Sequence, residues 1–203
     1  MKKMLPLLLS MTFLCLIACE KNTLEYESTF DQSYKEWQKF KIASADSYSY
    51  QVTNSTWTGS SWVTRITVVG GKIEERKFYY SVWNGIQRPV EGWDSVPIEE
   101  LIKILGMTLQ EFNGQGGLTF RDKLEWTEGR EDIGHSVDSP ASDLYTLDDV
   151  YAMVRSNWLK KRAGVKIYFE TENNGLISTA GFVSDDCMDD CFVGIHINSI
   201  QSL

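Results

Sequence analysis

Apolar and polar residues alternate with a period of two in six short stretches of the chain, which predicts six β-strands. Two longer stretches, 29–43 and 147–158, repeat apolar residues at helical spacing and predict a helix before each group of three strands. The predicted strands are residues 48–53, 62–69, 72–80, 165–170, 176–183 and 192–200. The pattern therefore indicates two similar units, each a helix followed by three strands, with a longer segment between them.

Turn and capping motifs set the limits of these elements. Gly70–Gly71 separates two strands by two residues, the spacing of a tight hairpin. Thr29 with Gln32 has the spacing of a capping box, and Thr146 with Asp149 resembles one. Because tight hairpins force antiparallel pairing, we predict an α+β fold with an antiparallel sheet and helices on one face. The predicted order is helix, three strands, insertion, helix, three strands.

Residues 83–143 interrupt the pattern and are predicted to be an insertion that is rich in glycine turns. Within it we expect a short helix at about 98–105 and a strand at about 118–126. Apolar residues make up 42% of the chain, which is enough for a packed core. Residues 29–203 are therefore expected to form a single domain that includes the insertion.

The first residues have the pattern of an export signal, in which Lys2-Lys3 precedes the apolar residues 5–18. As a helix this stretch would reach only ~21 Å, short of the ~30 Å hydrocarbon core of a bilayer. It ends in Leu16-Ile17-Ala18-Cys19, which resembles the bacterial lipobox. The resemblance implies that residues 1–18 are removed as a signal peptide. It also implies that Cys19 gains a diacylglyceryl group and an acylated amino terminus, with palmitate as the expected chain.

Cys19 is thus the expected attachment site of an envelope lipoprotein, and residues 19–28 its polar tether. Two or more acyl chains bury many CH₂ groups at ~0.8 kcal/mol each, so the attachment would be stable. Glu20 follows the cysteine, and by analogy with lipoproteins that lack Asp there we expect the periplasmic face of the outer membrane. The alternative is an ordinary secretory signal cut at an Ala-x-Ala-like site, with Cys19 incidental.

Charge limits the possible partners. The 203 residues have a formal net charge of −8, and loss of Lys2 and Lys3 with the signal makes it −10. An acidic body repels both phosphate backbones and anionic lipid headgroups. We therefore expect no nucleic-acid partner and a membrane contact through the anchor alone. The expected partner is an envelope protein, a peptide or a glycan.

Four stretches of the chain carry a resemblance to a known family. They are Tyr48-Ser49-Tyr50, Gly70–Ile73, Tyr145–Val150 and the tail from Tyr168 to Asp186. In this order they resemble the small secreted bacterial proteins grouped as domain-of-unknown-function family 6174. The resemblance implies a fold and export from the cell, and it implies no activity. This chain departs from the pattern in its long insertion and in the two cysteines of its acidic loop.

Cys187 and Cys191 flank this loop at the ends of a predicted hairpin turn. Once Cys15 is removed and Cys19 is lipidated, they are the two remaining thiols, and an oxidising periplasm favours a disulfide between them. The alternatives are a redox pair, which usually has two intervening residues, and a metal site, which would need further ligands.

Four carboxylates lie close together in the same loop, those of Asp185, Asp186, Asp189 and Asp190. Their mutual repulsion could be relieved by Ca²⁺, which prefers hard oxygen ligands. The run lacks the alternating spacing and distal Glu of an EF-hand loop. A solvated acidic turn is therefore the simpler interpretation, with weak Ca²⁺ binding as the alternative and no other cofactor expected.

Neither histidine stands in a recognisable catalytic motif. His135 lies in the insertion near Asp132 and Asp138, and His196 lies on a strand face with Phe192. No Gly-x-Ser-x-Gly motif accompanies either one, although a Ser-His-Asp site can assemble from distant parts of a chain. A periplasmic hydrolase that uses His135 or an acidic pair is therefore the enzymatic alternative.

Seven tryptophans are many for a domain of this size. In the core they add apolar mass, whereas exposed together they would form a platform for a ligand. Trp83 and Trp93 are the preferred exposed pair, because binding residues gather on loops over rigid scaffolds. The leading prediction is a non-catalytic envelope lipoprotein that binds a protein, peptide or glycan through its insertion. A hydrolase and a Ca²⁺-stabilised structural module are the alternatives.

Overall fold

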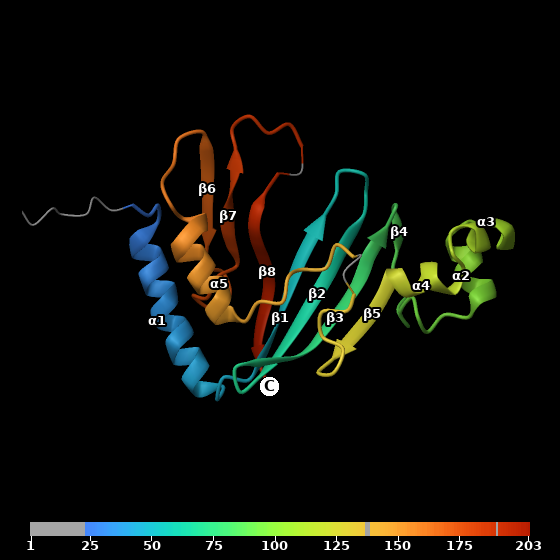
Figure 1. Cartoon of the computed structure of the whole chain (residues 1–203), viewed down its shortest axis with the longest axis horizontal. Coiled ribbons are helices and arrows are strands. Elements are labelled where there is room, and N and C mark those ends of the chain that lie inside the picture. The colour runs from blue at the N-terminus through green and yellow to red at the C-terminus, as the bar shows by residue number, and fades with distance from the viewer. Residues whose placement is uncertain (1–22, 137–138, 190) are drawn as a thin grey trace, which may run out of the picture.

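The computed structural model describes residues 23–136, 139–189 and 191–203, which form the predicted α+β fold (Figure 1). The helices are α1 (Glu27–Ala43), α2 (Ile98–Ile104), α3 (Leu109–Gly114), α4 (Leu118–Leu124), α5 (Leu147–Met153) and the π-helix η1 (Val154–Trp158). The strands are β1 (Tyr48–Ser55), β2 (Ser61–Val69), β3 (Lys72–Trp83), β4 (Ile86–Gln87), β5 (Glu125–Gly129), β6 (Val165–Glu170), β7 (Thr179–Ser184) and β8 (Val193–Ser202).

The strands form one antiparallel sheet in the order β4-β3-β2-β1-β8-β7-β6, with β5 paired to β3 as an eighth strand. The first and last strands of the chain meet in its middle, because β1 pairs with β8. The hairpin between β2 and β3 is confirmed, with Gly70 and Gly71 at φ 56° and 77°. Such positive angles at both turn residues suit glycine and match the twist of the flanking strands.

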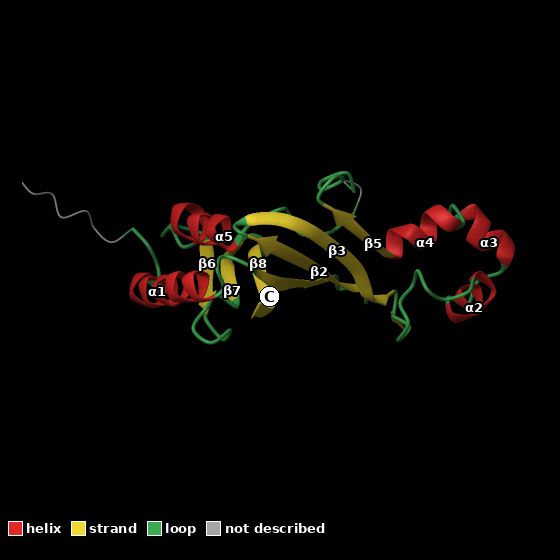
Figure 2. Ribbon diagram, turned by 90° about the horizontal axis from the view of Figure 1, so that it is seen from below, coloured by secondary structure: helices red, strands yellow, loops and turns green. Residues whose placement is uncertain are grey.

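Helices α1 and α5 pack on the same face of the sheet, here called the helix face, which carries Tyr48, Tyr50 and Val52. The Trp37 ring of α1 lies 5.3 Å from the Tyr48 ring and 5.9 Å from that of Tyr151 in α5. Figure 2 shows both helices beside β6 and β7, at the end of the sheet opposite the insertion helices. The alternate side chains of β1, such as Ser49 and Thr53, point to the other face, here called the outer face.

The two predicted helix caps have opposite outcomes. The predicted capping box at the start of α5 is confirmed, since Thr146 accepts a hydrogen bond from the Asp149 N–H and Asp149 accepts one from that of Thr146. The predicted cap of α1 at Thr29 is wrong. That helix already begins at Glu27, after Tyr26 in the left-handed region, and no side chain caps it. The last turn of the helix predicted over 147–158 is the π-helix η1.

The insertion builds a second, smaller core from its helices and the adjoining end of β3. The expected helix at 98–105 is confirmed as α2. The expected strand at 118–126 is wrong, since residues Leu118–Leu124 form helix α4 and only the following residues form β5. Phe120 and Leu124 are the buried residues of α4, and their spacing of four places both on one helical face.

An ion pair that is shielded from solvent ties the insertion to the main sheet. The Arg76 guanidinium of β3 donates to both carboxylate oxygens of Glu128 in β5, from Nε at 2.9 Å and Nη2 at 3.0 Å. Glu128 also accepts hydrogen bonds from the backbone N–H groups of Gly134 and Ser136, and Arg76 donates to the Ser142 carbonyl. The pair therefore fixes the course of the chain that crosses from β5 to α5.

The hairpin between β6 and β7 differs slightly from its prediction. The strand expected at 176–183 begins only at Thr179, because Leu176 and Ile177 are buried in the main core before the sheet pairing starts. The turn before them holds Asn174 and Gly175 at φ 54° and 87°. The final strand, β8, runs from Val193 to Ser202 and lies between β7 and β1.

Candidate functional site

The sheet is split where β1 and β8 separate. These strands pair only from Tyr48–Ser202 to Val52–Ile197, and the register shifts by one residue just before the last pair. Yet β1 continues to pair with β2 as far as Ser55, and β8 with β7 as far as Val193. We call the gap between residues 53–55 and residues 193–196 the seam. Figure 1 shows the two hairpins diverging there.

A hollow of about 790 Å³ opens on the outer face of the seam. Hydroxyl groups from β1 and β2 line one side, among them those of Thr53, Ser55 and Ser61. The rings of Phe192 and His196 line the opposite side and stack on each other, with centroids 4.2 Å apart. This combination of hydroxyls and stacked rings suits a ligand with both polar and apolar parts.

A second hollow, of about 480 Å³, opens on the helix face of the same seam. Its floor includes Ile195 of β8, and Met153 and Trp158 come from α5 and η1. The chain that crosses from β5 closes it with residues 140–143, of which Ser142 donates its backbone N–H to the Thr64 hydroxyl of β2. The Arg76–Glu128 pair therefore holds one wall of this hollow in place.

Two side chains line both hollows, those of Asn54 in β1 and Trp62 in β2. The indole Nε1 of Trp62 is buried and has no hydrogen-bond partner among the described residues. An unsatisfied buried donor is uncommon in folded proteins and costs ~1–3 kcal/mol. Its position in the wall of the seam singles out this region from the rest of the sheet.

His196 is half-buried on the outer face, and its environment suits packing better than proton transfer. Burial lowers the pKa of its imidazole, and the Phe192 ring stacks on it. Its Nδ1 lies 3.3 Å from the Thr179 hydroxyl. The sequence placed His196 on one strand face with Phe192, but it gave no sign that the neighbouring strand ends its pairing at this point.

The exposed tryptophan pair predicted in the insertion is not found. Trp93 is 0% exposed and lies in the second core, where its indole N–H donates to the Tyr80 carbonyl at 2.7 Å. Trp83 packs edge-on against Tyr80 and also contacts Phe120. The expectation that Trp93 is exposed for binding is therefore wrong, because the side chain is buried in the insertion's own apolar core.

His135 lies at the surface, in a shallow hollow with Ser136, Ser139 and Asp122. Within the described part of the chain, no hydrogen bond joins its ring to a hydroxyl or a carboxylate. Asp138, which the sequence places nearby, is outside the described residues. The described residues thus bring together candidate hydrolase groups without the contacts that would activate a nucleophile.

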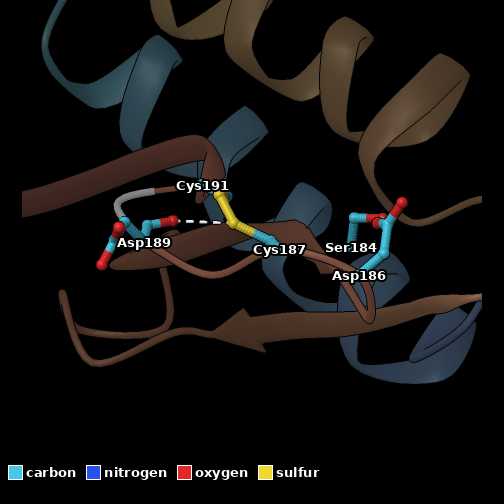
Figure 3. The surroundings of a disulfide bond; sticks show 5 residues. All are labelled: Ser184, Asp186, Cys187, Asp189 and Cys191. Atoms are coloured by element: carbon cyan, nitrogen blue, oxygen red, sulfur yellow. Dashed lines mark hydrogen bonds between the residues drawn. A yellow bond between two sulfur atoms is a disulfide. The ribbon is translucent and has the colours of Figure 1, made fainter.

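The acidic loop between β7 and β8 holds the two cysteines side by side, with Cα atoms 6.1 Å apart (Figure 3). That separation is within the range a disulfide requires, and the disulfide stays a prediction. Asp186 accepts a hydrogen bond from the Ser184 hydroxyl, which lowers the pKa of its carboxyl group. Figure 3 shows Asp186 and Asp189 on opposite sides of the cysteine pair.

The calcium hypothesis also stays a prediction. Among the residues that the structure describes, no three carboxylate, histidine or cysteine side chains converge as metal ligands. Asp185 is exposed, like Asp186 and Asp189, whereas Asp190 is outside the described ranges.

Comparison with known proteins gives no relative. No protein-family model, no curated protein and no solved structure matches the chain. The expected lipidation site, Cys19, is outside the described residues, and so is the rest of the signal segment. From residue 23 onward, apart from the gaps, no helix combines the length and apolar character needed to cross a bilayer.

Proposed function

We propose that the protein is a lipid-anchored envelope protein whose α+β domain is a non-catalytic binding module. The observation that carries the binding role is the seam, where two hollows adjoin and have Asn54 and Trp62 in common. The seam replaces the insertion as the proposed binding site, since the insertion's Trp93 is buried.

The lipid anchor rests on the sequence, and the structure limits how far the domain could lie from the membrane. Only residues 20–22 separate Cys19 from Thr23, and a fully extended chain spans at most ~3.6 Å per residue. Leu24 forms a bridge with Lys160, and the Glu25 N–H donates to the Leu159 carbonyl. The chain is therefore fixed beside the end of η1 from Leu24 onward, within the segment 19–28 that was expected to be a tether. Lipidation at Cys19 would therefore hold the domain within ~15 Å of the membrane surface.

Cell fractionation tests the anchor. The Cys19→Ser variant should move from the membrane to the soluble envelope fraction, while Cys191→Ser, which leaves the lipobox intact, should stay with the membrane. If Cys19→Ser remains in the membrane fraction to the same extent as the unaltered chain, the lipid anchor is refuted.

Site-specific photo-crosslinking in cells tests the binding role separately. A photoreactive residue at position 193, in the seam, should form an adduct of defined mass. The same residue at position 69, a similarly exposed valine at the opposite end of β2, should not form it. Equal adducts at both positions, or none at either, would contradict a binding site in the seam.

A further inference from the structure

We infer that the seam binds a short, extended peptide of neutral or basic charge, which adds its backbone to the sides of β1 and β8 that face the gap. This inference rests on the proposed binding function and names its ligand class. It is carried by the sheet's pairing, by the position of the two hollows and by the charge of their walls.

Strand pairing provides the first argument. Beyond the Val52–Ile197 pair, each of the two strands keeps a partner on its far side only, β2 for β1 and β7 for β8. No strand in the described part of the chain pairs with the sides of Asn54–Ser55 and Val193–Ile195 that face each other. Strand sides without a partner are templates for another strand, and extended peptides commonly bind by adding to them.

The two hollows provide the second argument. Successive side chains of a strand point to opposite faces of a sheet. A peptide in the seam would therefore send alternate side chains into the hollow on the outer face and the hollow on the helix face. Asn54 and Trp62 line both hollows, so the two adjoin at these residues.

The lining indicates which peptide fits. On the helix face Met153, Trp158 and Ile195 offer an apolar surface, whereas the outer face offers hydroxyls and the Phe192 ring. Asp143 is the one acidic residue among the residues that line the two hollows. Together with the formal net charge of −8, it disfavours an acidic peptide. The expected ligand alternates apolar and small polar residues and has neutral or basic ends.

A display library of random heptapeptides is the probe, selected on the full chain held in detergent. Selected peptides should bind Val193→Arg at least tenfold more weakly than the unaltered chain, because the new cation occupies the helix-face hollow and repels a basic ligand. Val69→Arg is the matched control, since Val69 and Val193 are 45% and 47% exposed and both lie in strands. Equal urea midpoints for both variants would show that folding is intact.

N-methylation of the peptide backbone distinguishes strand pairing from side-chain binding. Methyl groups on alternate amides should lower the affinity at least tenfold for one parity of positions, or for both if the peptide pairs with both strands. Amides of residues 193–195 should also exchange more slowly with deuterium when the peptide is bound. Affinity that is unchanged by N-methylation in both parities would overturn the inference.

Two further outcomes separate this inference from the proposed function. If no selected peptide is weakened by Val193→Arg, the peptide inference fails. If the crosslinked adduct at position 193 is then removed by muramidase and not by protease, the binding function stands and its ligand is a glycan. If the adduct is instead a second copy of this chain, the seam is a self-association surface and the inference is likewise overturned.

Discussion

Replacement of Arg76 should destabilise the protein far more than replacement of a neighbouring surface arginine. The exposed fractions of the Arg76 and Glu128 side chains are 8% and 3%, so removal of Arg76 leaves a carboxylate with little access to water. Removing one partner of such a pair typically costs 3–5 kcal/mol. Arg130, which pairs with Glu74 at the surface, is the matched control, and its replacement should cost at most ~1 kcal/mol.

The double variant separates two roles of this pair. Replacing a buried ion pair by apolar residues of similar volume is often neutral or stabilising. Here, however, Glu128 also accepts hydrogen bonds from the backbone N–H groups of Gly134 and Ser136. Each amide left without a partner costs ~1–3 kcal/mol. We therefore expect Arg76→Leu with Glu128→Leu to remain at least ~2 kcal/mol less stable than the unaltered chain.

Urea unfolding followed by tryptophan fluorescence measures these differences, from the midpoints and a common m-value. The reasoning fails if Arg76→Ala costs no more than Arg130→Ala. If the double variant regains full stability, the pair acts through its charges alone. The proposed role of Glu128 in fixing the chain that crosses from β5 to α5 would then be wrong.

Three further predictions concern pH, the second core and the cysteines. Burial alone would raise the pKa of Glu125 and Glu128, but hydrogen bonds to arginine and to backbone N–H groups outweigh it and lower both pKa values. The stability that these two carboxylates add is therefore present above the ordinary glutamate pKa of ~4.3 and is lost as the pH falls through their pKa values in the folded protein. Replacing both with Gln should make the urea midpoint depend less on pH between pH 6 and pH 3. Trp93→Ala should cost ~3–5 kcal/mol and expose residues 90–120 to protease, and an unchanged cleavage pattern would count against a separate second core. Alkylation before and after reduction should show Cys187 and Cys191 as thiols only after reduction, and Cys191→Ser should cost ~2 kcal/mol, whereas ready alkylation of the native chain would exclude the disulfide.

Local patterns predicted most of the fold because each acts over a few residues. The alternation in β1 and β2, the Gly70–Gly71 turn and the Thr146 cap need no knowledge of the rest of the chain. The pattern predicts a strand at 118–126 because Leu118 and Phe120 also fit a period of two, whereas residues Leu118–Leu124 form a helix. A helix is favoured because it buries both Phe120 and Leu124, and that burial depends on the second core that they help to form.

The candidate site was much less predictable, because it depends on where pairing stops. The pairing of β1 with β8 ends just after the register shift between Gln51 and Val52, and no sequence motif predicts that shift. The contact between Arg76 and Glu128 joins residues 52 positions apart, so it too required the pairing of β3 with β5. In contrast, the Thr108–Glu111 capping box of α3 has a plain sequence signature that the prediction overlooked.

Packing on the outer face argues that the seam is a specified feature of the sheet. The Phe192 ring lies over Gly181 and Gly194, and a Cβ at Gly181 would come within 2.6 Å of it. The rings of Tyr168 and His196 hold Phe192 there, at centroid distances of 6.2 Å and 4.2 Å. This arrangement keeps the first residues of β8 against β7. It is possible because Gly181 and Gly194, which face each other, have no side chains. The pairing of β1 with β8 ends at Val52, just after its register shift, and this packing keeps β8 with β7 beyond that point, so the sheet remains open where a strand could be added.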